Sequence, residues 1–571
     1  KDEVRALDHS ISELRQHKDE WARLEPREKL ALLEQLPGRV ALNADRWVEA
    51  GLAAKGLEPD SPYAGEEWTA GPWATLHGLN ILIRTLGSLA EGERLPRGPA
   101  RTRHDGQVVV EVAPLDIWER LLLSGFSAEI WMQPGVTLDN LEDNRAHFYR
   151  QGSTEGRVAL ILGAGNVSSI SPLDVLSKMV EEGMVCLLKM SPVIDYVGPI
   201  LEEIFAPLVD RGFLRIAYGG TEVGTYLVGH DGIDVVHMTG SNVTHDAIVF
   251  GPGPEGEERR RRGEPLLDKP ITSELGGVTP TIVVPGPWSE RDLRYQAEHI
   301  ATQKLHNVGF NCVAAQVLVL PADWDRTDRL LAALRETLRS VKPRPTYYPG
   351  AADRQQKAVR AHPGAEVLQP NGGSGAARTL IPGLDPEARG DISFREEHFG
   401  PVLAQTSLPG GDARSFLGHA VKFCNEQLQG SLAVNLIVHP RTAAELGEGL
   451  DDLVSEFCYG TVGINVWAGA AFLLFQASWG AFPGHTLQDV QSGIGVVHNG
   501  LLFDKPERTV VRGPFYPFPR SLAHGELHWS PKPPWFVTHR QAHVACRRLT
   551  RFAAARGWRH LPGIFLASMR G

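Results

Sequence analysis

The chain has 571 residues, of which 42% are hydrophobic and 22% are charged, so it is long enough to bury more than one core. Its formal net charge of −10 argues against a nucleic-acid partner, which would require a basic surface. The five cysteines include no CxxC pair, and their odd number favours a reducing compartment over a disulfide framework.

The first residues of the chain, Lys1-Asp2-Glu3, are charged and predict no secretory signal. The longest apolar run, residues 468–475, is far shorter than the roughly 18–20 residues that span a bilayer. We therefore expect a cytoplasmic protein with no transmembrane segment.

Residues 10–60 are predicted to be helical, because leucines and tryptophans recur near helical spacing between charged positions. A second helical stretch is expected over residues 66–90. The pattern then changes to a short strand from Val108 to Val112.

From residue 157 onward, short apolar strands alternate with helices. Strands are expected at 158–162, 185–189, 214–217 and 235–238, with helices at 172–182 and 197–209. This rhythm predicts a mostly parallel sheet that is covered by helices on both faces.

A second α/β region is predicted to begin with a strand at 281–284. It continues with helices at 293–304 and 327–338 around a strand at 316–320. Residues 343–390 are rich in Pro and Gly and predict loops, and the tail after residue 500 gives the weakest pattern.

Three segments combine chemically reactive side chains with glycine. They are Asn307–Cys312 (NVGFNC), Glu274–Gly277 (ELGG) and Glu396–Val402 (EEHFGPV). In order and character they resemble the signature segments of the aldehyde dehydrogenase superfamily. The resemblance covers residues 20–500 and extends to Asn166 after a strand, Lys189 at the end of the next, the turns Gly220–Gly224 and Met238–Ser241, and the strand Gly460–Asn465.

The resemblance implies an α/β fold with a Rossmann-like parallel-sheet cofactor domain, an α/β catalytic domain and a small oligomerisation element. The N-terminal helices and the cofactor domain would occupy 1–273, with an oligomerisation strand segment near 105–155. The catalytic domain would occupy 274–465. Residues 466–571 would return to the cofactor domain and add an oligomerisation segment and a C-terminal extension, in a homodimer or homotetramer.

Oxidation of an aldehyde by hydride transfer requires a tetrahedral carbon that bears an alkoxide, and addition of a thiolate to the carbonyl produces it. Cys312 is the predicted nucleophile. Because a free thiol is mostly protonated at neutral pH, a base is needed, and Glu274 is the candidate for this step and for activating water. The resemblance implies that the side-chain amide of Asn166 and the backbone N–H of Cys312 stabilise the alkoxide.

The implied cofactor is NAD or NADP, although no GxGxxG motif follows the first strand of the sheet. The resemblance assigns the pyrophosphate to the helix after Ser241, with close backbone approach at Gly220 and Gly224. It places Lys189 at the adenosine ribose, Glu397 at the nicotinamide ribose and Phe399 beside it. No metal is expected.

One departure concerns Pro192, which stands where many family members carry a ribose-binding glutamate. Loss of that carboxylate removes repulsion of a 2′-phosphate, so we expect NADP to be tolerated. The predicted substrate is a hydrophobic aldehyde, aliphatic or aromatic, because Ala470 to Phe475 with Trp467 and Trp479 could line a tunnel. Core packing is an equally good interpretation of this apolar run.

Two other functions stay open. Gly165-Asn166-Val167 is also similar to acyl-CoA reductases, which would make the chain a CoA-dependent enzyme, although the presence of Glu274 favours hydrolysis. A catalytically inactive scaffold is the second alternative, and the retention of Cys312, Glu274 and Asn166 argues against it.

Overall fold

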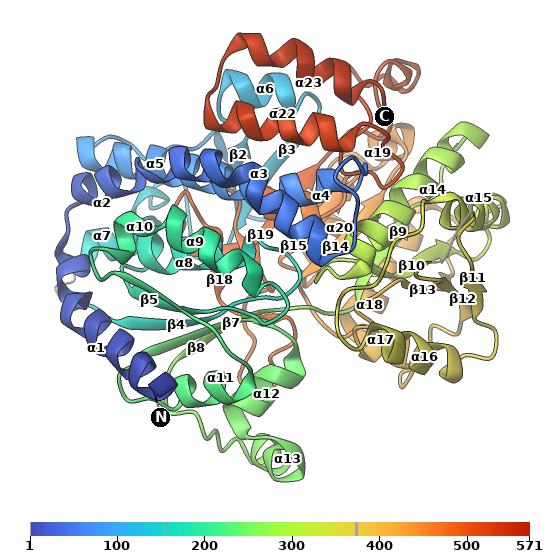
Figure 1. Cartoon of the computed structure of the whole chain (residues 1–571). Helices are drawn as coiled ribbons and strands as arrows, with labels where there is room; N and C mark the ends of the chain where they lie inside the picture. Colours follow the sequence, from blue (N-terminus) through green and yellow to red (C-terminus); the bar gives the residue numbers. More distant parts are fainter. Residues whose placement is uncertain (1, 153–154, 372–374) are drawn as a thin grey trace.

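The computed structural model describes residues 2–152, 155–371 and 375–571. Lys1, residues 153–154 at the end of the predicted 105–155 segment, and residues 372–374 within the predicted loop region lie outside the described residues. The described chain is a mixed α/β structure with two large sheets, which confirms the predicted fold class (Figure 1).

The smaller of these sheets has six strands and contains the four strands predicted between residues 158 and 238. Its order is β17 (Gly493–Ile494), β8 (Ile271–Leu275), β7 (Val235–Gly240), β4 (Val158–Leu162), β5 (Val185–Lys189) and β6 (Leu214–Ala217). All pairs are parallel except that of β17 with β8. The central strands are buried on both faces, which explains their continuous Val, Leu and Ile content.

Helices cover both faces of this sheet, as the alternating pattern predicts. α8 (Ile170–Leu176) and α9 (Gly198–Ile204) lie on one side in Figure 1, and α1 (Asp2–Arg23), α11 (Thr221–Val228) and α12 (Asn242–Phe250) lie on the other. The polar helix α13 (Gly253–Arg262) projects below them.

The larger sheet has eleven strands, in the order β1-β2-β3-β19-β15-β14-β9-β10-β13-β12-β11. The strands from β19 to β12 are parallel, and the strands at each end are antiparallel. Their bounds are β1 Ala100–Thr102, β2 Val108–Ala113, β3 Ser127–Met132, β19 Pro506–Arg512, β15 Thr461–Ile464, β14 Ala433–Ile437, β9 Thr279–Val283, β10 Ala315–Pro321, β13 Val402–Leu408, β12 Arg378–Leu384 and β11 Glu366–Leu368.

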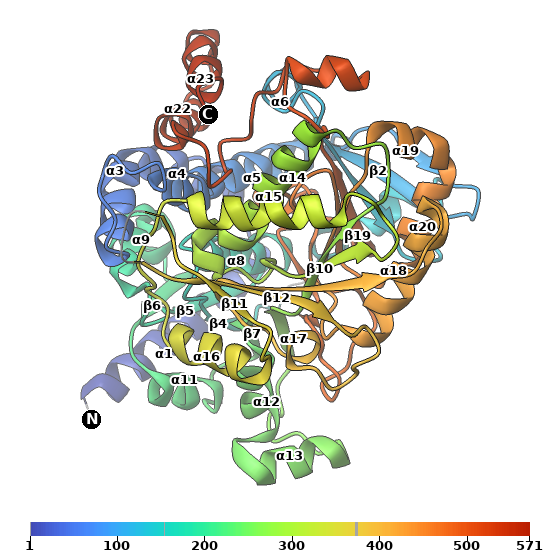
Figure 2. The same cartoon turned by 90° about the vertical axis from the view of Figure 1, so that its right-hand side faces the viewer.

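The chain crosses from the six-stranded to the eleven-stranded sheet at Gly276–Val278, between β8 and β9. Glu274, the first residue of the predicted catalytic domain, therefore lies on the last parallel strand of the smaller sheet. α14 (Glu290–Leu305) and α15 (Thr327–Ser340) cover the larger sheet after the crossing, close to their predicted ranges (Figure 2).

The N-terminal helices and the C-terminal segment pack together above the two sheets (Figures 1 and 2). α3 (Leu36–Ala54), α4 (Ala64–Trp68), a π-helical turn (Thr69–Trp73) and α5 (Ala74–Glu91) form the lower layer. α22 (Ala542–Ala554) crosses α4 closely, because a Cβ atom at Gly65 would lie 2.8 Å from the backbone of Ala542. α23 (Leu561–Ser568) then packs on α22.

Among the described residues, no helix is both long enough and apolar enough to cross a bilayer.

Candidate active site

Cys312 lies in a tight loop between α14 and β10. Three successive residues, Asn307, Val308 and Gly309, have positive φ values of 52°, 58° and 82°. This conformation is unfavourable for a β-branched residue such as Val308, so the surroundings of the loop must enforce it.

Asn307 anchors this loop through both its backbone and its side chain. Its backbone N–H donates to Oε2 of Glu66, and its Nδ2 donates to the carbonyl oxygen of Asn166, both over 3.0 Å. Lys55 and Tyr347 donate to Oδ1 of Asn307 over 3.1 and 3.0 Å. The loop that carries the nucleophile is thus tied to the N-terminal helices and to the loop after β4.

Glu274 projects from β8 next to Cys312, and its side chain is almost fully buried. Trp479 Nε1 donates to Oε1 of Glu274 over 3.3 Å, and the Cys312 thiol is close enough to this carboxylate to lower its pKa. Burial, followed by the negative charge of Asp174, raises the pKa of Glu274 to about 7. The carboxylate is therefore poised to exchange a proton near neutral pH.

Asp174 lies behind Glu274 and is completely buried. Its carboxylate accepts a hydrogen bond from Thr239 Oγ1 over 3.0 Å and lies 3.5 and 3.7 Å from the rings of His237 and His498. Burial would raise the pKa of Asp174, but these two histidines hold it well below its usual range. Asp174 thus remains charged and acts on Glu274 through space.

The thiol of Cys312 is only partly exposed, towards the cavities around it. Burial, then the charges of Glu274 and Glu397, raise its pKa well above the ordinary value. Cys312 is therefore a neutral thiol at rest, and Glu274 is the adjacent acceptor for its proton.

Asn166 follows β4 and lines both cavities that contain Cys312. One N–H of its side-chain amide donates to the carbonyl oxygen of Phe310 over 3.0 Å. An amide carries two such hydrogens, so the second is available to a group bound at Cys312.

One of these two cavities is a cleft of about 590 Å³ between the two sheets. It brings together six of the predicted residues, namely Asn166, Ser241, Glu274, Cys312, Glu397 and Phe399. Ser241 caps α12 by accepting a hydrogen bond from the backbone N–H of Thr244 over 3.2 Å. The other predicted cofactor residues, Lys189, Gly220 and Gly224, lie outside the lining of this cleft.

Glu397 is one of the residues that line the cleft. A Cβ atom at Gly276 would lie 2.2 Å from Oε1 of Glu397, so only glycine leaves room for this carboxylate. Burial raises the pKa of Glu397 to about 8, with an opposing contribution from Lys304. Lys304 is itself buried and donates to the carbonyl oxygen of Gly400 over 3.0 Å.

The second cavity at Cys312 is small, about 60 Å³, and apolar. Its wall includes Trp467, Trp479, Ala470, Phe472 and Leu473, which the sequence offered either as tunnel wall or as core. These side chains face a cavity, whereas Phe475 at the end of the same run is buried against His498.

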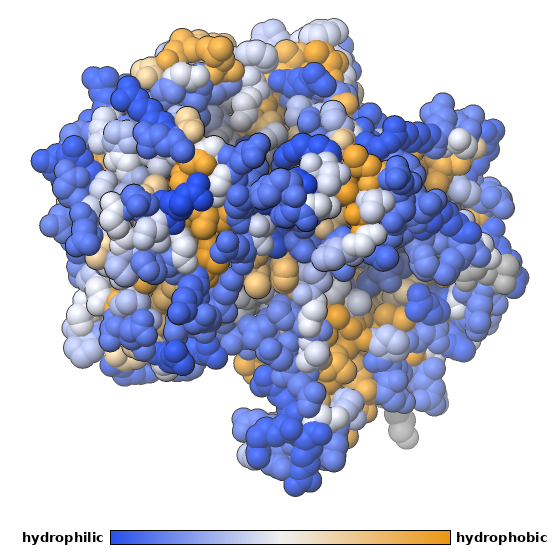
Figure 3. Space-filling model, turned by 180° about the vertical axis from the view of Figure 1, so that it is seen from behind, coloured by the Kyte–Doolittle hydropathy of each residue, from blue (hydrophilic) through white to orange (hydrophobic). Residues whose placement is uncertain are grey.

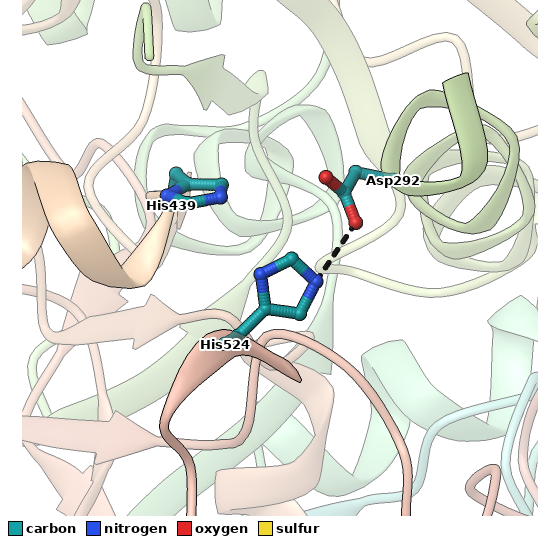
Figure 4. Close-up of side chains that lie close together, drawn as sticks. All are labelled: Asp292, His439 and His524. Atoms are coloured by element: carbon teal, nitrogen blue, oxygen red, sulfur yellow. Dashed lines mark ion pairs between the residues drawn. The ribbon is translucent and has the colours of Figure 1, made fainter. Parts of the chain in front are cut away.

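Asp292, His439 and His524 form a separate group of potential metal ligands (Figure 4). Their ligand atoms lie within 4.8 Å of one another, and His524 Nε2 lies 3.0 Å from Asp292 Oδ1. Asp292 Oδ2 and His439 Nδ1 already accept the backbone N–H groups of Ser289 and Arg441. The group joins the C-terminal part of the chain to the first turn of α14, away from the lining of both cavities.

The sequence patterns did not predict a role for three residues of this site, Asp174, Lys304 and Asn307. Asp174 and Lys304 lie on helices, and their roles depend on partners brought near by folding. Asn307 was recognised only as the first residue of a motif. Its positive φ could have been suggested by the sequence, because asparagine adopts this conformation more often than most other residues do.

Comparison with known sequences supports the resemblance. Residues 158–409 match the family model described as "Aldehyde dehydrogenase family". Aldehyde dehydrogenase family 3 member A2 from Rattus norvegicus is 23% identical over 292 residues, which is 49% of this chain and 54% of that protein. N-succinylglutamate 5-semialdehyde dehydrogenase 1 from Caulobacter vibrioides is 29% identical over 247 residues, 40% of this chain and 48% of that protein. The chain thus spans about half the length of these curated relatives.

Solved structures share the fold over most of the chain. An NADP-dependent glyceraldehyde-3-phosphate dehydrogenase from Bacillus halodurans, complexed with NADP, has a TM-score of 0.59 at 18% identity and covers 89% of this chain and 91% of its own. An aldehyde dehydrogenase from Mycobacterium tuberculosis, complexed with NAD+, has a TM-score of 0.58 at 18% identity and covers 88% of each chain.

Proposed function

We propose that this chain, whose residues 158–409 match the aldehyde dehydrogenase family model, oxidises an aldehyde to the carboxylic acid with NAD or NADP. The observation that carries this proposal is the buried Glu274 carboxylate, which lies beside Cys312 in one cavity, at the point where a second cavity also reaches Cys312. One cavity is suited to the cofactor and the other to an apolar aldehyde.

The first step is proton transfer from Cys312 to Glu274, which turns the neutral thiol into a nucleophile. The sulfur then forms a bond to the carbonyl carbon of the aldehyde, and the carbonyl oxygen becomes an alkoxide. The free N–H of the Asn166 amide and the backbone N–H of Cys312 donate to this oxygen.

The residues of the cleft fit a nicotinamide dinucleotide. Ser241 and the N-terminus of α12 present backbone N–H groups to a pyrophosphate, and the Glu397 carboxylate, lodged against Gly276, is placed to bind ribose hydroxyls. When bound, the nicotinamide ring supplies the acceptor for the hydride that leaves the substrate carbon. Phe399 and Glu397, which line the cleft together with Cys312, would hold that ring.

Loss of hydride leaves an acyl group joined to Cys312 as a thioester. Glu274, with a pKa of about 7, first releases to solvent the proton that it took from Cys312, and it then deprotonates a water molecule that attacks the thioester. The bond between sulfur and the acyl carbon breaks as the acid forms, and Glu274 returns a proton to the sulfur to regenerate the thiol. The same residue therefore acts before and after the oxidation step. Because this base is present, we propose water rather than CoA as the acceptor of the acyl group.

The decisive assay measures reduced nicotinamide formed from a panel of aldehydes with NAD+ or NADP+, with and without CoA. We expect turnover without CoA and none in Cys312→Ala, while Cys458→Ala, at an exposed cysteine, keeps wild-type activity. Activity that strictly needs CoA would establish the acyl-CoA reductase alternative. Activity of the Cys312→Ala variant, or an inactive wild type with every aldehyde, would refute the proposal.

We further propose a homo-oligomer in the cytoplasm. β1 ends the large sheet as a half-exposed edge strand, which is a surface that pairs readily with a second copy. The five cysteines are all free thiols, which suits a reducing compartment. Light scattering of the purified chain tests the first statement, and a monomeric mass would contradict it.

A further inference from the structure

A larger apolar cavity of about 150 Å³ adjoins the small apolar cavity at Cys312. We call the small cavity at Cys312 the inner cavity and the larger one the outer cavity. The two share Thr69, Leu473 and Trp535 as lining residues, so these side chains form the partition between them. Trp535 is only partly buried and packs edge-on against Phe126, with ring centroids 5.9 Å apart.

The wall of the outer cavity is built largely from the C-terminal segment. On the far side it presents apolar residues of α22, α23 and the proline-rich stretch before them, namely Pro533, Pro534, Leu549, Phe552, Ala553, Ile564 and Phe565. On the near side it presents Trp73 together with Trp118 and Leu122 of α6 (Ile117–Leu122).

The C-terminal segment is firmly attached at this place. Asn80 Nδ2 donates to the carbonyl oxygen of Ala553 over 2.9 Å, and Ser530 Oγ donates to that of Ser124 over 2.6 Å. Arg556 forms an ion pair with Asp116 at 2.8 Å. The cavity is therefore a fixed feature of the fold.

The polar groups in this wall have partners within the protein. His77 Nε2 lies 2.8 Å from Gln476 Oε1, and Gln476 Nε2 donates to Glu119 over 3.0 Å. Asn80 and Arg556 are engaged as described above. The wall residues His77, Asn80, Glu119 and Arg556 thus all have partners within the protein, so the chemistry of the cavity favours a hydrocarbon.

We propose that the two cavities form one substrate tunnel and that residues 530–568 make it selective for aldehydes with a long, unbranched apolar chain. The inference rests on the proposed function, because the aldehyde carbon must reach Cys312. The first methylenes then occupy the inner cavity, and the chain passes between Leu473 and Trp535. Only a narrow, flexible chain can cross this partition and fill the outer cavity.

Figure 3 shows apolar residues grouped at the top of the molecule, where α6 and the C-terminal helices lie. Large exposed apolar side chains in this region include Ile117 of α6 and Trp529, Trp558, Leu566 and Met569 of the C-terminal segment. None of these five residues lines the tunnel, so they provide control positions.

The test compares kcat/KM for propanal, octanal and hexadecanal in the wild type and in Ala553→Phe. Each methylene that becomes buried raises kcat/KM by about fourfold until the tunnel is full. In Ala553→Phe the new ring occupies the outer cavity, so kcat/KM for hexadecanal falls by at least about tenfold, the effect of roughly two lost methylenes. Propanal does not reach this cavity and keeps its value.

Ala555→Phe is the matched control, because Ala555 is exposed on the same segment and does not line the cavity. A second pair, Phe565→Ala against Leu566→Ala, enlarges the cavity without a risk of overpacking. Phe565→Ala should move the preferred chain length upward, and Leu566→Ala should not.

The proposed tunnel would be overturned if Ala553→Phe lowered kcat/KM equally for propanal and hexadecanal, or if the wild type showed no preference for chain length. Either result leaves aldehyde oxidation itself intact. A wild type that oxidises none of the aldehydes contradicts the proposed function instead.

Discussion

Trp479 donates a hydrogen bond from Nε1 to Oε1 of Glu274 over 3.3 Å, and both side chains are almost fully buried. The same indole lines the inner substrate cavity and packs edge-on against Phe472, with ring centroids 5.6 Å apart. The proposed base is thus held by a residue of the substrate wall. A donor to the ionised carboxylate favours that form, so Trp479 lowers the pKa of Glu274.

Replacing Trp479 by Phe should therefore raise the pKa of Glu274 further above 7. We expect the acidic limb of the kcat/KM profile to move upward by about 0.5–1 pH unit, the equivalent of one hydrogen bond. Trp467→Phe is the matched control, because Trp467 lines the same cavity but donates to the backbone of Val313. An equal shift in both variants would show that the indole of Trp479 has no specific role.

Glu274→Gln should lower turnover by about 10²–10⁴-fold, because the amide cannot accept the proton of Cys312 or of water. If Glu274 serves hydrolysis as proposed, the variant accumulates an acylated protein that intact-mass spectrometry detects. Glu264→Gln, at an exposed carboxylate outside the lining of both cavities, serves as the control. Wild-type turnover in Glu274→Gln would remove this residue from the mechanism.

The same substitution should stabilise the fold at alkaline pH. The unfolded chain loses the Glu274 proton from about pH 4.5 upward, whereas the folded protein retains it until about pH 7. The raised pKa therefore costs stability progressively across this window, and Glu274→Gln removes the cost. We expect a gain on the order of 1–3 kcal/mol near pH 8 and little change near pH 4 from thermal or urea unfolding. A gain that does not depend on pH would contradict this origin.

Asn166→Ala should lower kcat by about 10²–10³-fold, the usual effect of losing one donor to an alkoxide. The affinity for the oxidised nicotinamide, measured by calorimetry, should change little if the amide serves the alkoxide. A large loss of cofactor affinity with unchanged kcat would place Asn166 in cofactor binding instead.

Pro192 is exposed in the turn after β5, and its neighbour Ser191 lines the cofactor cleft. Because no carboxylate stands at Pro192 to repel a 2′-phosphate, we expect comparable kcat/KM values with NAD+ and NADP+. Pro192→Glu should lower the value for NADP+ by about tenfold or more and leave NAD+ nearly unchanged. Strict dependence of the wild type on NAD+ would reject this explanation.

The sequence alone was sufficient for three neighbouring parallel strands of the small sheet, because β4, β5 and β6 begin and end at the predicted residues. For β4 and β5 the reason is that strands buried on both faces are continuous apolar runs. It was insufficient for the tail. β19 enters the middle of the large sheet, and α22 and α23 are defined by what they pack against rather than by a strong local pattern.

The candidate site divides in the same way. Residue type and motif order singled out Cys312, Glu274 and Asn166, because few side chains can serve as nucleophile, base and amide donor. Only the tertiary structure decided the protonation states of these residues and the contacts that hold them in place. The pKa values of Glu274 and Cys312 follow from burial and from charges such as Asp174, which lies 100 residues from Glu274 in the chain but beside it in the fold. Burial and through-space charge depend on long-range packing, so no local pattern could have revealed them.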